Sequence, residues 1–179
     1  MNRFLPKLCN FLAFQITWAL GMISVSRGLA GWGTALMMLN VAAHLAFNTP
    51  KNRGREAVVI LAGALVGVAA DAASLSLRLL TYRGEQRVSP EFLLLFYALW
   101  ANFGTALRVS LGWTWNKLWA AAILGAIGGP IAYLSGARLG AVTLPERLGP
   151  SVAAFAVEFG VLTPAWIWIA SRVLKERGA

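Results

Sequence analysis

The sequence predicts an all-α, polytopic integral membrane protein, a bundle of six transmembrane helices with both termini in the cytoplasm. Three observations predict this class. Hydrophobic residues make up 58% of the 179 residues and charged residues only 13%, whereas a soluble domain carries about 25% charged residues. The mean hydropathy is +0.64, and long segments contain no charge at all. We therefore expect a single transmembrane domain over residues 1–179.

The gaps between charged residues predict where the helices cross the membrane. One crossing needs about 20 mostly apolar residues, and three long segments contain no Asp, Glu, Lys or Arg, while three more contain a single one. Strands are excluded because these segments are too continuously apolar for the alternation of a membrane barrel. The first span is long for a cleaved signal peptide, which is the alternative interpretation of it. The expected spans are about 8–26, 29–48, 56–77, 92–112, 117–137 and 150–171.

The distribution of lysine and arginine predicts the orientation, because these residues are enriched in cytoplasmic loops. With the N-terminus inside, nine of them fall in cytoplasmic segments, six in outer segments, and Arg108 within a span. The net charge of +9 is thus interpreted as loop anchoring, and no nucleic-acid partner is expected. The nine cytoplasmic residues are Arg3, Lys7, Lys51, Arg53, Arg55, Lys117, Arg172, Lys175 and Arg177.

The scarcity of cysteine and histidine limits the chemistry of the chain. Cys9 and His44 are each the only residue of their type, which excludes an intrachain disulfide, a cysteine-based metal site and a two-histidine zinc site. We expect no metal and no cofactor. The spacing of the serines does not bring one to His44, so no catalytic residues are predicted and a non-enzymatic role is favoured.

Ionisable residues inside the spans are candidates for a functional site, because a charge at a helix centre costs roughly 2.5–3.5 kcal/mol on insertion scales. Asp71, Tyr133 and Glu158 fall at similar depth in the outer half of three spans, and Arg138 lies at the outer end of one. We expect them to form an outer ligand-binding cluster in which Arg138 neutralises one carboxylate. The alternative is that Arg78 extends locally to water and Glu158 lies at the membrane interface.

A second candidate ligand site lies in the inner half. Asn40 and His44 share one helix face, being four residues apart, and Arg108 and Gln15 fall at similar depth in other spans. The forked guanidinium of Arg108 is suited to a phosphate or carboxylate, so this group could bind an anionic headgroup. The alternative is that Arg108 extends to the cytoplasmic headgroups and His44 caps a helix end.

Small residues recur at intervals of four in two spans, and such intervals allow two helix backbones to approach closely. Close packing is the favoured interpretation. Pro130, which removes a backbone hydrogen bond and predicts a kink, leaves open a broken helix that lines a ligand site. The small residues are Gly63 and Gly67 in the third span, and Gly125, Gly129, Gly136 and Gly140 in and after the fifth.

Three stretches carry a resemblance to a known family. They are Asn10-Phe11 with Phe14-Gln15 and Trp18; Leu99-Trp100 with Phe103, Leu107 and Ser110-Leu111; and the run from Gly125 to Tyr133 with Gly136 and Leu139 to Val142. Over nearly its whole length the chain resembles the bacterial family called domain of unknown function 2878. The resemblance implies a small multi-pass protein of the bacterial inner (cytoplasmic) membrane with no assigned chemistry, and a connection with membrane lipid.

Three functions are compatible with these features. The first is the binding or handling of a lipid or small amphiphile within the helix bundle. The second is a substrate-binding or transport subunit that needs partner chains, and the third is a scaffold for a membrane lipid-modifying enzyme. The expected partners are membrane lipid and either a second copy of the chain or another membrane protein.

Overall fold

The computed structural model describes residues 4–48 and 53–174. Within them the chain is all-α, as predicted, with six α-helices, one 3₁₀ turn and only isolated β-bridges. The elements are α1 (Phe4–Ser26), α2 (Ala30–Phe47), α3 (Arg53–Ser76), α4 (Pro90–Gly104), η1 (Gly112–Thr114), α5 (Leu118–Arg138) and α6 (Leu148–Leu174).

Five of the described helices are long and apolar enough to cross a membrane, namely all except α4. The fourth predicted span, 92–112, is wrong in its extent, because the helix ends at Gly104 and residues 105–117 form turns around η1. With 15 residues, α4 is only about 22 Å long, less than the roughly 30 Å hydrocarbon core. The chain therefore has five full-length helices and one short helix continued by irregular backbone.

Local hydrogen bonds explain where α4 begins and ends. At its start the Ser89 side chain accepts from the Phe92 amide, and Pro90 occupies the first turn, where its missing N–H is not needed. At its end the Thr105 hydroxyl donates to the Asn102 carbonyl. Within the irregular segment 105–117, the Trp115 indole donates to the Leu107 carbonyl. Backbone at membrane depth needs such partners, because lipid offers none.

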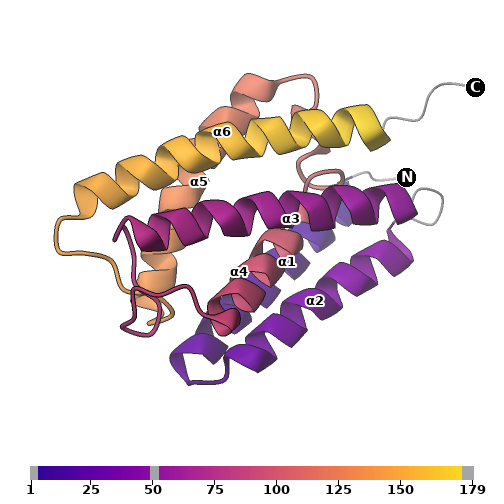
Figure 1. The fold of residues 1–179 in the computed structure, drawn as a ribbon. Helices are drawn as coiled ribbons and strands as arrows, with labels where there is room; N and C mark the ends of the chain where they lie inside the picture. Colours follow the sequence, from indigo (N-terminus) through magenta and orange to yellow (C-terminus); the bar gives the residue numbers. More distant parts are fainter. Residues whose placement is uncertain (1–3, 49–52, 175–179) are drawn as a thin grey trace, which may run out of the picture.

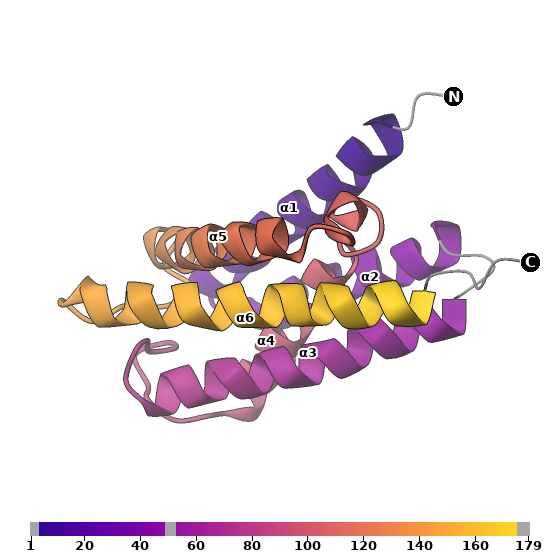
Figure 2. The same ribbon diagram turned by 90° about the horizontal axis from the view of Figure 1, so that it is seen from above.

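The helices alternate in direction along the chain (Figures 1 and 2). The start of α1, the end of α2, the start of α3 and the end of α6 lie at one end of the bundle, which we call the terminal end. The opposite end, called the loop end, holds the connections 27–29, 77–89 and 139–147. Helix α4 packs mainly on α2 and α3, whereas α5 packs along α6, which in turn contacts α3.

This arrangement gives a topology prediction. A reporter fused after Ala179 should lie in the cytoplasm and one inserted between Gly84 and Arg87 in the periplasm, because the lysine and arginine count favours an inner terminal end. Four residues of that count, Arg3, Lys51, Lys175 and Arg177, lie outside the described residues. Paired alkaline phosphatase and fluorescent-protein fusions measure the outcome, and the opposite pattern would reverse the orientation.

Candidate functional site

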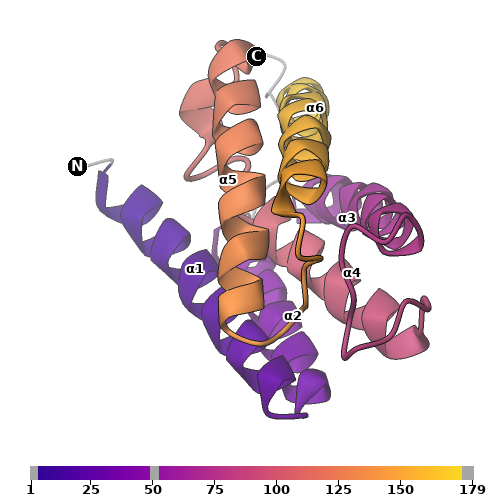
Figure 3. The ribbon, with the colours of Figure 1, turned by 90° about the vertical axis from the view of Figure 1, so that its left-hand side faces the viewer.

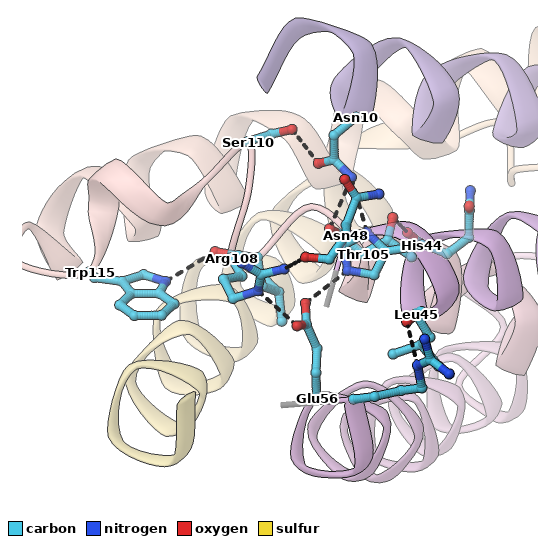
Figure 4. A network of polar contacts seen from close by, with 12 residues as sticks. Asn10, His44, Leu45, Asn48, Glu56, Thr105, Arg108, Ser110 and Trp115 are labelled. Carbon is cyan, nitrogen blue, oxygen red and sulfur yellow. Dashed lines mark hydrogen bonds and ion pairs between the residues drawn. The ribbon is translucent and has the colours of Figure 1, made fainter. Parts of the chain in front are cut away.

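A buried ionic network lies at the terminal end of the bundle (Figure 4). Its centre is Glu56, in the first turn of α3, which is only 1% exposed. The Arg108 Nε donates to Glu56 Oε2 at 2.7 Å, and His44 Nε2 lies 2.8 Å from Glu56 Oε1. Arg108 also donates to the Asn48 carbonyl. The carboxylate thus joins α2, α3 and the segment after α4, and we call this group the terminal network.

Asn10 of α1 completes the terminal network. Its amide nitrogen donates to the Thr105 carbonyl at 3.2 Å and to His44 Nδ1 at 3.3 Å, and its amide oxygen accepts from the Ser110 hydroxyl. Because Nδ1 accepts, Nε2 carries the proton that bonds Glu56. Ser110 therefore meets Asn10 and not the imidazole, so this arrangement does not form a serine nucleophile with a histidine base.

A neutral polar cluster lies deeper in the bundle and is centred on Asn102 of α4, which is fully buried. Its side-chain oxygen accepts from the Asn40 amide at 2.7 Å and from the Thr17 hydroxyl at 3.1 Å. Its own amide donates to the Phe14 carbonyl at 3.2 Å. These bonds hold α1, α2 and α4 together and give both polar atoms of the Asn102 side chain a partner.

Asp71, in the last part of α3, and Glu158, in α6, have carboxylates that lie close together. Asp71 is fully buried and accepts from Trp100 Nε1 at 2.6 Å and from the Tyr133 hydroxyl. Ser74, one turn after Asp71, donates to Glu158 Oε2 at 3.2 Å, while Glu158 Oε1 is buried without a hydrogen-bond partner among the described residues. An aspartate, a tyrosine and a glutamate from three helices thus meet around one turn of α3.

The structure brings together most residues of the predicted outer cluster and divides the inner one. Asp71, Tyr133 and Glu158 gather as described, but Arg138 is exposed at the end of α5 and forms no ion pair in the described part of the chain. His44 and Arg108 share Glu56, which the sequence reasoning treated only as a span boundary. Asn40 belongs to the Asn102 cluster and Gln15 is exposed on α1. A ligand-binding role for either set stays a prediction.

The predicted small-residue faces are close helix contacts. A Cβ atom at Gly125 would lie 2.1 Å from the Phe159 carbonyl oxygen, and one at Gly129 would lie 2.5 Å from the Phe159 ring. The tryptophan rings of α4 and α6 lie equally close to Gly67 and Gly63 of α3. Gly136 has only ordinary contacts, and Gly140 has a positive φ of 78° beside Ser26. α5 runs through Pro130 as one helix, so the broken-helix alternative is wrong for this span.

A cavity of about 370 Å³ lies between α1 and α5, with α4 and α6 forming its floor. Its α1 wall runs from Phe11 to Met22 and its α5 wall from Leu124 to Gly136, each about 16–18 Å along the helix axis. The lining is almost wholly apolar. The side chains with polar atoms in it are Gln15, Trp18, Tyr133, Ser135 and Thr163.

The shape of the cavity follows from the divergence of α1 and α5 (Figure 3). The two helices approach each other at the loop end, where a Cβ atom at Gly140 would lie 3.3 Å from Ser26 Cβ. Toward their N-terminal ends they separate, and the segment 105–117 passes between them, contributing Leu111 to the lining. Helices α1 and α5 therefore converge at the loop end of the cavity, which we call its narrow end, and diverge toward the terminal end, which we call its wide end.

Comparison with known proteins identifies a family without an assigned activity. The model of the family described as protein of unknown function (DUF2878) matches residues 7–165. No curated protein and no solved structure is significantly similar to the chain. The match covers every helix described above except the first turn of α1 and the last part of α6. The chain therefore belongs to the DUF2878 family of proteins of unknown function.

Proposed function

We propose that this protein binds a single hydrocarbon chain of a membrane lipid or amphiphile in the cavity between α1 and α5. The observation that carries the proposal is the cavity itself, elongated, apolar and placed among helices that are suited to membrane insertion. Its volume of about 370 Å³ lies within the range of about 300–1,000 Å³ typical of small-molecule sites.

The chemistry of the wall favours a hydrocarbon chain over a polar solute. Aromatic and aliphatic side chains of α1 and α4 face a strip of α5 that includes Gly125, Gly128 and Gly129. Gly128 has open space where a side chain would stand, so an unbranched chain can lie against the helix backbone there. A polar solute would lose its hydration here and find few partners, which costs several kcal/mol in an apolar medium.

One hydroxyl group in the wall is available to a ligand. Thr163 of α6 is 2% exposed and lines the cavity, and within the part of the chain that the structure describes its Oγ1 has no hydrogen-bond partner. An unused buried hydroxyl is costly. A carbonyl or ester oxygen near the headgroup of a bound chain would accept a hydrogen bond from this hydroxyl. Acylated lipids carry such an oxygen.

The two other functions suggested by the sequence make less use of this geometry. A polar transport path would need a row of open polar groups, whereas Asn102, Asp71 and Glu56 are each hydrogen-bonded within the bundle. Glu158 Oε1, which has no partner among the described residues, is not part of the cavity lining. A scaffold needs no cavity. Mass spectrometry of material purified in mild detergent separates the three functions, because it detects a lipid, an ATPase or an enzyme.

Gly128→Leu should abolish binding of the chain without unfolding the protein. A Cβ atom at Gly128 meets nothing within 4 Å, so the leucine fits the helix but projects into the cavity. Native mass spectrometry should then show loss of the co-purified lipid and at least a tenfold weaker affinity for added hexadecanoate.

Gly31→Leu is the matched control, because Gly31 of α2 is also exposed with open space and does not line the cavity. It should retain lipid as the unmodified protein does. Equal lipid content in Gly128→Leu and the unmodified protein, with both folded, would contradict the proposed function.

A further inference from the structure

Two lysines lie just beyond the lining residues at the wide end of the cavity. Lys7 lies four residues before Phe11, on the α1 face that lines the cavity, and Lys117 immediately precedes α5, seven residues before Leu124 of the lining. The segment that crosses the gap connects them, because the Ser110 hydroxyl donates to the Lys7 carbonyl and the segment ends at Lys117. Both lysines are exposed.

No carboxylate neutralises these lysines within the described part of the chain. The four ion pairs found there involve arginine or histidine only. Glu56 is the only described acidic residue at the terminal end, and its two oxygens are bound to His44 and Arg108. Among the described residues, the positive charge at the wide end of the cavity is therefore uncompensated.

We propose that the bound chain has an anionic headgroup, a carboxylate or a phosphate, held at the wide end of the cavity by Lys7 and Lys117. This inference rests on the proposed function. At the narrow end α1 and α5 converge, where Ser26 approaches Gly140, so the slim methyl end of the chain points there. The head then lies at the terminal end, level with the two ammonium groups at the membrane surface. A free fatty acid and a single-chain phospholipid share this chemistry.

The experiment compares three probes that have the same sixteen-carbon chain and differ only in the headgroup. Hexadecanoate and hexadecyl phosphate are anionic, and hexadecanol is neutral. Affinities are measured by native mass spectrometry of the purified full chain in a mild non-ionic detergent at about pH 8, where both acids are ionised. The unmodified protein should bind one or both anionic probes at least tenfold more tightly than hexadecanol.

The variants test whether the lysines cause this preference. A lysine near a membrane surface contributes about 1 kcal/mol to anion binding, so each single Lys→Gln change should weaken anionic binding about 5-fold and the pair K7Q/K117Q about 30-fold. Binding of hexadecanol should not change. The control R27Q/R138Q removes two exposed arginines at the narrow end and should leave all three affinities unchanged.

The outcomes separate the headgroup inference from the proposed function. Equal binding of all three probes to the unmodified protein would overturn the anionic headgroup and leave the cavity function standing. An anionic preference that survives in K7Q/K117Q would overturn the role of these lysines. If no probe binds and no lipid co-purifies, the proposed function itself fails. A preference for only one anionic probe distinguishes a fatty acid from a phosphate lipid.

Discussion

Glu56→Ala should destabilise the protein by about 3 kcal/mol, because removing one member of a buried ion pair leaves the others uncompensated. Arg108 and His44 both lose their carboxylate, and the link between α2, α3 and the segment 105–117 is broken. Thermal unfolding in detergent micelles measures the loss. We expect a lower midpoint and early exposure of the segment to proteolysis.

Glu85→Ala is the control, since Glu85 forms an exposed pair with Arg87 at 3.6 Å and such pairs contribute about 0–1 kcal/mol. A double-mutant cycle gives a further check. Once Glu56 is alanine, Arg108→Ala should cost little more, because coupled residues are non-additive. Additive losses, or equal stability of Glu56→Ala and Glu85→Ala, would show that the terminal network does not act as a unit.

Gly125→Ala should cost about 2–3 kcal/mol or more, although alanine is the better helix former. The added Cβ would lie 2.1 Å from the carbonyl oxygen of Phe159, and a backbone atom cannot rotate away as a side chain can. Helices α5 and α6 must therefore separate. Gly129→Leu should have a similar effect through the Phe159 ring. The midpoint of thermal unfolding reports both.

Gly128→Ala provides a control on the same helix, three residues farther along, with no atom within 4 Å of the added Cβ. Its stability should equal or exceed that of the unmodified protein. If Gly125→Ala and Gly128→Ala unfold at the same temperature, the contact between α5 and α6 is not limited by the size of residue 125.

The sequence was sufficient to predict the long helices, because their position follows from local composition alone. The boundaries of α1, α2, α5 and α6 differ by only a few residues from the spans predicted from the charge pattern. Depth along the predicted spans also placed Asp71 and Tyr133 at the same level, and the two side chains are hydrogen-bonded. In these cases the prediction needs only the position of each residue along the membrane normal.

Sequence reasoning missed Glu56 and the end of α4 for a shared physical reason. The charge pattern set the start of the third span at Glu56 and so made this carboxylate a boundary, yet inside the bundle Arg108 pairs with Glu56 and His44 donates a hydrogen bond to it. Residues 105–111 are mostly apolar, so hydropathy does not detect that the helix has ended. The sequence did contain an indication of this ion pair, since Glu56 and Arg108 fall at similar depth in two successive spans.

The cavity could not be predicted from composition, since it depends on the angle between α1 and α5. Gly128 shows the difficulty. In the sequence it is one more small residue beside Gly125 and Gly129, but those two contact Phe159 whereas Gly128 lines empty space. Which glycines contact α6 and which line the cavity depends on the face that α5 turns toward α6, and the sequence alone does not show this face.

The polar partners of α4 also bear on how the chain is assembled during synthesis. Asn102 bonds to α1 and α2, Trp100 bonds to Asp71 of α3, and Arg108 bonds to Glu56 of α3. All of these partners precede α4 in the sequence, so they have left the ribosome before α4 emerges. A short helix that would insert poorly alone thus meets a ready set of hydrogen-bond partners in the bilayer. We expect the hairpin of α5 and α6 to join the unit formed by the first four helices. The hydrogen bonds from Tyr133 to α3 and from Ser151 to the connection after α3 would then form last.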